Sequence, residues 1–310
     1  MRRSAARSLA LLLLAAGASP AWAQSETDEA APAIVVTGQR ALTESEALDV
    51  VRRVARPVDG QLARFHEPIC PRVTGFQTQY ERMVAERIKD VAERAGADAG
   101  ADGCVANFYV VIVDDGPGFV REMARKHPGV FSGVSKQEFD RLASEPGAAR
   151  AWSNTVLTNS NGTPVGAPPS SAGGGVVKRG YQGSSVTIDG SVNVVRVQET
   201  SNVNPSVQQA MQSSWVVLET GATFGKTLTQ LGDYAAMRGL AMVQPSELDG
   251  SEDTILGLFE PDAAVSAPEL TEFDLAYLTS LYRAHPRRWA RTQVRNIAEG
   301  ISRQTQEGQP

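Results

Sequence analysis

The run ANFYVVIVDD, residues 106–115, constrains the fold of this chain more than any other stretch. Its β-branched and aromatic residues predict a buried strand, because such side chains pack well on a pleated sheet. An amphipathic helix, residues 79–96, comes shortly before it and ends at Gly96. The predicted inner face of that helix consists of Met83, Val84, Ile88, Val91 and Ala95. Together the helix and the strand predict a layered α+β fold, with a sheet packed against helices.

The other predicted elements fit the same fold class. Thr43 and Glu46 form a capping box before an apolar helical pattern that Pro57 stops. A second buried strand is predicted at residues 213–220, and two helices at 269–284 and 287–304. We therefore expect a single α+β domain over residues 43–303, with a mixed sheet against several helices and a disordered tail at 304–310.

Residues 1–23 have the features of a secretory signal peptide. Three arginines precede an apolar run from Leu9 to Ala16, and small residues flank the cleavage position in AWA, residues 21–23. The apolar run is shorter than the roughly 20 residues that span a bilayer. The sequence therefore predicts a periplasmic or secreted protein whose mature chain has no transmembrane segment.

The predicted mature chain is acidic. The full chain has a net charge of -5, and losing the three arginines of the signal peptide gives -8. Nucleic-acid-binding proteins need a basic surface. We therefore expect no nucleic-acid partner.

Residues 24–42 are predicted to be flexible, because acidic and small residues cannot bury enough apolar surface to become ordered. Within them, IVVTGQR, residues 34–40, resembles the TonB box of TonB-dependent outer-membrane receptors. Such a box pairs with a partner strand by edge addition. An ordinary leading β-strand is the alternative reading, and the many helices exclude a receptor barrel for the rest of the chain.

The chain has two cysteines, Cys70 and Cys104. In an exported protein the oxidising compartment favours a disulfide between them. A different feature is the stretch from 159 to 185, which is rich in Gly, Ser, Asn and Pro and is predicted to be a mobile insertion.

Few residues have the spacing of a known chemical motif. The three histidines are far apart in sequence, so no pair has metal-ligand spacing, and we predict no metal and no cofactor. Asp114 and Asp115 end the buried strand, where carboxylates can hold a cation or act as a base. The alternative role for this pair is to cap the helix that follows.

The stretch QLGDYAAMRGLAM, residues 230–242, reads as an amphipathic helix that keeps the spacing of HExxHxxGxxH without any of its histidines. The positions of that zinc motif are taken by Gly232, Asp233, Ala236, Gly239 and Met242. An ordinary helix with an internal glycine at 239 explains the same residues.

The surroundings of this helix resemble the metzincin-type metalloproteases. There a strand leads into the zinc helix, the helix ends at the motif glycine, a turn with a methionine follows, and a last helix closes the domain. Here SEDTILGLF, residues 251–259, takes the place of the turn, with Leu256 near the methionine position. The last helix holds Leu270, Thr271, Asp274, Leu278, Leu281 and Tyr282 in the matching pattern. The whole chain also resembles uncharacterised exported proteins of alphaproteobacteria, which implies no activity.

This resemblance implies a zincin-like domain that has lost its zinc ligands. We expect a non-catalytic binding or envelope-associated protein that uses Asp233, Tyr234 and Arg238 toward an envelope protein or a small ligand. The alternative is a hydrolase in which Asp114, Asp115 and Asp233 hold a divalent metal in one cleft. A polar cleft at residues 230–242 would favour binding or chemistry, whereas a helix buried on all sides would favour a scaffold.

Overall fold

The computed structural model describes residues 41–144, 147–159, 162, 164–165, 178–181, 184–187, 205–245, 247–248, 252–260 and 267–307. Residues 39–310 belong to one compact unit. The predicted signal peptide, the TonB-box-like segment and most of the predicted insertion lie outside the described residues.

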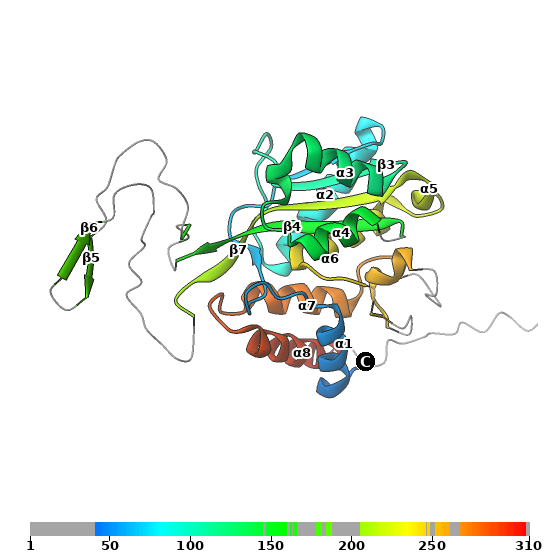
Figure 1. Cartoon of the computed structure of the whole chain (residues 1–310). Coiled ribbons are helices and arrows are strands. Elements are labelled where there is room, and N and C mark those ends of the chain that lie inside the picture. The colour runs from blue at the N-terminus through cyan, green and yellow to red at the C-terminus, as the bar shows by residue number, and fades with distance from the viewer. Residues whose placement is uncertain are drawn as a thin grey trace, which may run out of the picture. The chain divides into compact units, whose positions relative to one another are not determined.

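A five-stranded, mostly parallel sheet forms the centre of the fold (Figure 1). Its strands are β1 (Arg64–Phe65), β2 (Pro71–Thr74), β3 (Phe108–Val113), β4 (Ala149–Thr158) and β7 (Gln208–Glu219). One edge of β7 pairs with β4, which is antiparallel. The other edge of β7 pairs in parallel with β1 and then β3, and β2 lies outside β3. The strand β4 is therefore an antiparallel edge strand beside the central strand β7.

Helices cover both faces of this sheet. They are α1 (Glu44–Val54), α2 (Thr78–Ala95), α3 (Gly116–Lys126), η1 (Pro128–Phe131), α4 (Lys136–Ser144), α5 (Thr220–Thr223), α6 (Leu228–Ala241), η2 (Ile255–Phe259), α7 (Glu272–Arg283) and α8 (Ala290–Glu307). The helices α2 and α6 pack in the main core with one face of the sheet, and α3, η1 and α4 pack on the other face. The helices α7, α8 and α1 form a further group, which joins the main core through α2 and α6. None of the helices in the described ranges is both long and apolar enough to cross a membrane.

A separate two-stranded antiparallel sheet begins within the predicted insertion and extends past its end at residue 185. It pairs β5 (Lys178–Tyr181) with β6 (Ser184–Thr187). The stretch 159–185 is expected to be a mobile insertion without regular structure, and the structure instead places one short β-hairpin at its end.

Capping contacts confirm three of the predicted helix ends. Thr43 and Glu46 form the capping box of α1. Gly96 ends α2 in the left-handed conformation at φ 86°, and Asp115 caps α3 by accepting a hydrogen bond from the Gly118 N–H. The predicted inner face of α2 is wrong at one residue, because the side chain of Met83 is 57% exposed. Adjacent helical residues point about 100° apart, so the inner face that contains Val84 turns its neighbour Met83 to solvent.

Two predicted boundaries are wrong, and one contact explains both. The helix α8 continues to Glu307, beyond the predicted start of the disordered tail at 304. The Leu42 N–H, predicted to lie in the flexible N-terminal segment, donates to Thr305 Oγ1 at 3.2 Å. Leu42 also packs against the main core. The end of the N-terminal segment and the end of α8, both predicted to be disordered or flexible, therefore contact each other.

The structure contains the predicted disulfide between Cys70 and Cys104. The Cys70 residue directly precedes β2, and Cys104 lies in the loop before β3. Their Cα atoms are 6.0 Å apart. The bridge therefore fastens the loop between α2 and β3 to the start of the outer strand.

Replacing Tyr277 by Phe is expected to raise the free energy of unfolding by about 1 kcal/mol. On folding, a buried hydroxyl without a partner loses its hydrogen bonds to water, and no hydrogen bond within the protein replaces them. The Tyr277 side chain is fully buried on α7, and its hydroxyl has no hydrogen-bond partner within the described residues. The matched control is Tyr282→Phe, since the Tyr282 hydroxyl donates to the Leu240 carbonyl at 3.1 Å. Urea unfolding should show a gain for the first variant and a loss for the second. Equal losses would contradict the expectation.

Candidate functional site

Helix α6, which carries the predicted binding residues, is buried along most of its length. Every residue from Leu231 to Ala241 is buried. Thr227 and Gln230 form a capping box at its start. It packs against α2, β7, η2 and α7. Any contact between this helix and a ligand is therefore restricted to its ends.

Asp233 is a structural residue inside this packing. Its buried carboxylate accepts two hydrogen bonds from Arg87 of α2, from Nε at 2.6 Å and from Nη2 at 3.0 Å. It also accepts the Leu270 N–H at 2.7 Å. The hydrogen bond to Asp233 raises the pKa of Arg87. Asp233 therefore joins α6 to α2 and to the segment before α7.

The two glycines at zinc-motif positions face different neighbours of α6. A Cβ atom added to Gly232 would meet Arg87 Cγ at 2.8 Å, so this position faces α2. A Cβ atom added to Gly239 would meet the Phe108 ring at 2.3 Å, so this position faces the sheet. The helix does not end at Gly239 but continues to Ala241, and its C-cap is Met242 in the left-handed conformation. Gly239 is therefore an internal residue of the helix.

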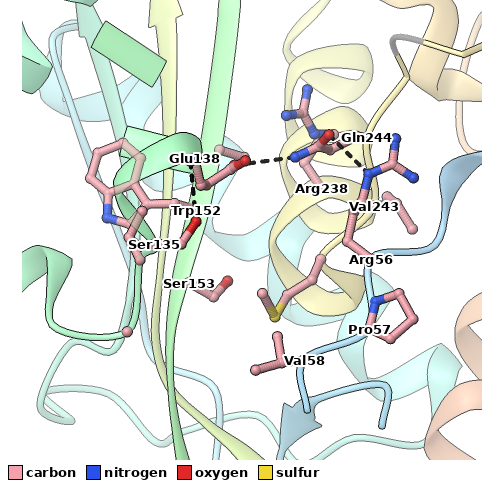
Figure 2. A pocket seen from close by; sticks show the side chains of 14 residues that line it. Arg56, Pro57, Val58, Ser135, Glu138, Trp152, Ser153, Arg238, Val243 and Gln244 are labelled. Atoms are coloured by element: carbon pink, nitrogen blue, oxygen red, sulfur yellow. Dashed lines mark hydrogen bonds between the residues drawn. The ribbon is translucent and has the colours of Figure 1, made fainter. Parts of the chain in front are cut away.

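A pocket of about 320 Å³ lies where the C-terminal end of α6 meets the edge strand β4 (Figure 2). Its walls come from four segments, which are the loop after α1, the loop and first turn of α4, β4, and the end of α6 with the residues that follow. Trp152, Met242 and Val58 supply apolar surface, while Arg238 and Arg56 supply positive charge. Its volume lies at the lower end of the range for small-molecule sites.

A chain of three polar side chains crosses one side of this pocket, as Figure 2 shows. Arg56 donates its Nε–H to Gln244 Oε1 at 3.0 Å, and Gln244 Nε2 donates to Glu138 Oε1 at 3.2 Å. Arg141 of α4 in turn donates to both oxygens of Glu138. The chain links the end of α1 to α4 across residues that follow α6, so it fixes the width of the pocket.

Arg238 is the predicted binding residue that lines the pocket. It is 4% exposed. Its Nη1 donates to the Tyr234 hydroxyl, and its guanidinium carbon lies 5.5 Å from the Tyr234 ring centroid. Burial raises the pKa of Tyr234, so the phenol stays protonated at neutral pH and supplies no negative charge. Arg238 Nε has no hydrogen-bond partner, and no carboxylate in the described part of the chain forms an ion pair with this arginine.

The contacts of Arg238 offset part of the cost of burying its charge, but none of them is an ion pair. Taking a guanidinium out of water costs several kcal/mol. The contact with the Tyr234 ring returns about 2 kcal/mol at most, and a cation near the C-terminal end of a helix gains up to about 2 kcal/mol. Arg238 lies in the last turn of α6, where that dipole acts. The wall of the pocket therefore holds a buried positive charge that forms no ion pair with a carboxylate of the described chain.

The three carboxylates of the alternative hydrolase do not converge. Asp115 caps α3, and Asp233 is held by Arg87 and the Leu270 N–H. Neither of them, nor Asp114, lines the pocket beside α6. Within the described residues, no three His, Cys, Asp or Glu side chains lie together as a metal site requires. The physical reason is that Asp115 is engaged by the cap of its own helix and Asp233 by a tertiary contact with Arg87.

Sequence reasoning missed most of the pocket. Arg56, Glu138, Trp152 and Gln244 belong to segments far apart in the chain and form no motif. Only Arg238 gave a signal, as a charged residue within a largely apolar helix. Its burial beside a cavity could not be read from the sequence, since other elements supply the cavity walls.

Comparisons with known proteins identify no family for this chain. A scan against protein-family models, a search of curated proteins and a search of solved structures each found no match.

Proposed function

We propose that this chain is a non-catalytic binding protein of the cell envelope, built on a zincin-like scaffold that has lost its zinc site. Its ligand occupies the pocket between β4 and the end of α6. The predicted signal peptide and the disulfide support an exported protein, because disulfides persist in oxidising compartments.

The order of elements supports the scaffold part of the proposal. The strand β7 leads through the short α5 into α6, η2 takes the place of the turn, and α7 follows. The pattern residues Thr271 and Asp274 cap α7, and Asp274 also accepts the Ile255 N–H of η2 at 2.8 Å. The last helix of the proposed scaffold is therefore bonded to the turn that precedes it.

The observation that carries the binding part is Arg238. Burying a cation beside a pocket without an ion pair lowers the stability of the fold. A bound anion would restore part of that stability. Arg64, another arginine of the described chain, is engaged by backbone carbonyls instead. Arg64 donates to the carbonyls of Leu281, Tyr282 and Ala284 at the end of α7. The contrast favours a ligand role for Arg238.

NMR of the protein with labelled methionine methyl groups tests this proposal. Hexanoate, hexanamide and hexylamine share one apolar tail and differ in the head group. At least one of them is expected to shift the Met242 methyl signal, because Met242 lines the pocket. The signal of Met83, which is exposed on α2, should not move.

A pocket-filling variant provides the control. Ala151→Leu places three more carbons at the pocket wall formed by β4 and should abolish the shift. Ala101→Leu, at an exposed position, should leave it unchanged. If none of the three compounds shifts Met242, or if Ala151→Leu responds like the parent protein, the binding proposal is wrong. Hydrolysis of casein by the purified protein would contradict its non-catalytic part.

A further inference from the structure

We infer that the ligand of this pocket is an organic monoanion, with a carboxylate held by Arg238 and an apolar body beside Trp152 and Met242. The inference rests on the proposed function, because it names the ligand class for the same pocket. It uses the unsatisfied guanidinium, the charge balance of the walls and the size of the cavity.

The chain itself shows how an arginine of this kind is satisfied. Arg87 holds the Asp233 carboxylate with Nε and Nη2, which are the two donors on one edge of the guanidinium. Such a parallel pair of hydrogen bonds matches the geometry of a carboxylate. In Arg238 this edge has no hydrogen-bond partner from the described residues, and only Nη1 is engaged. Because Arg238 Nε has no surface open to solvent, a ligand carboxylate would approach the guanidinium through Nη2.

Arg150 strengthens the comparison. It is buried nearly as deeply as Arg238, at 6% exposed. It has a carboxylate partner, Glu219, at 3.0 Å, and it also donates to the carbonyls of Leu142 and Gly147. Arg238, by contrast, forms no ion pair within the described residues, although the Glu260 carboxylate acts on its hydrogen-bond partner Tyr234.

The walls of the pocket favour a negative ligand. The charged lining residues are Arg56, Arg238 and Glu138. The carboxylate of Glu138 already accepts hydrogen bonds from Arg141 and Gln244. Arg56 is partly exposed and shares its charge with Glu247 at 3.0 Å. The positive charge that remains inside the pocket is therefore that of Arg238.

The apolar lining and the volume restrict the rest of the ligand. Trp152, Met242, Val58 and Val134 contribute apolar surface to the pocket. A cavity of about 320 Å³ restricts the ligand to a small molecule. One guanidinium balances one negative charge. A short-chain or aryl carboxylate fits these conditions better than inorganic phosphate, which carries more charge and no apolar body.

Calorimetric titration of the wild-type protein tests the ligand class. Hexanoate is expected to bind at least about tenfold more tightly than hexanamide, because a charge-assisted pair replaces neutral hydrogen bonds. Hexylamine and inorganic phosphate should bind more weakly than hexanoate. Arg238→Gln should remove the preference for hexanoate over hexanamide, and Arg238→Lys should keep part of it. Arg72→Gln, at an exposed position on β2, controls for the change in net charge.

The outcomes separate the two proposals. If hexanamide or hexylamine binds as tightly as hexanoate, the anion inference is overturned and the binding function stands. If phosphate equals hexanoate, the inferred apolar body is wrong. If no compound binds, both proposals fail. Should Arg238→Gln fail to fold, the head-group preference of the wild-type protein still decides the question.

Discussion

Replacing Asp274 by Leu is expected to lower the free energy of unfolding by about 4 kcal/mol or more, because several buried donors lose their acceptor together. Asp274 lies in the first turn of α7 and is fully buried. Its carboxylate accepts the Ile255 N–H at 2.8 Å and the Thr271 N–H at 3.1 Å, and it also accepts the hydroxyls of Thr254 and Thr271. Leucine has a similar volume but accepts no hydrogen bond.

The matched control is Asp274→Asn. Its amide oxygen can accept from the Ile255 and Thr271 N–H groups, and its NH2 can donate to the Thr254 hydroxyl oxygen. We expect a change of about 1 kcal/mol or less at neutral pH, measured by urea unfolding. Equal losses in the two variants would show that the hydrogen bonds of Asp274 contribute little, and that part of the argument would be wrong.

The same control has a second readout in its pH dependence. Burial raises the pKa of Asp274 from its ordinary value of 3.8 to about 6, against the opposing effect of its hydrogen bonds. Between these two values the folded state binds the proton more tightly than the unfolded state, so this group makes the protein less stable as the pH rises. The whole interval corresponds to about 3 kcal/mol. Relative to Asp274→Asn, the wild-type protein should therefore lose up to that amount between about pH 4 and pH 7.

Replacing Gly239 by Ala is expected to destabilise the protein by about 2 kcal/mol, although the same change inside an exposed helix stabilises by about 1 kcal/mol. The added Cβ would lie 2.3 Å from the Phe108 ring and 3.0 Å from Ser214 Oγ. Phe108 is fully buried and cannot swing away. Helix α6 must therefore move off the sheet, which also disturbs the end that lines the pocket.

Two further variants test this cause. Gly129→Ala, at a position with no atom within 4 Å of the added Cβ, should change stability by less than about 0.5 kcal/mol. Combining Gly239→Ala with Phe108→Leu should cost less than the sum of the two single changes, because the smaller side chain relieves the clash. Additive losses in thermal or urea unfolding would show that the ring of Phe108 is not the obstacle.

The sequence by itself determined the local structure of this protein. The capping boxes at Thr43 and Thr271, the glycine at the end of α2, and the buried strands β3 and β7 all follow from residues within a few positions of each other. The disulfide also follows from the sequence, because only two cysteines are present. These features depend on short-range hydrogen bonds, on hydrophobic periodicity and on a count, so no tertiary information is needed.

Only the tertiary structure decided what helix α6 does. Its hydrophobic pattern does not show that Asp233 faces Arg87, which is 146 residues earlier, or that Gly239 rests on Phe108. Likewise, α8 continues past its predicted end through a contact with Leu42, which is 263 residues away. The pocket joins four segments that are remote in sequence, and the burial of Arg238 depends on all of them. A side chain acquires its charge environment from whatever packs around it, so the solvation of Arg238 is a property of the assembled fold and not of its neighbours in the chain.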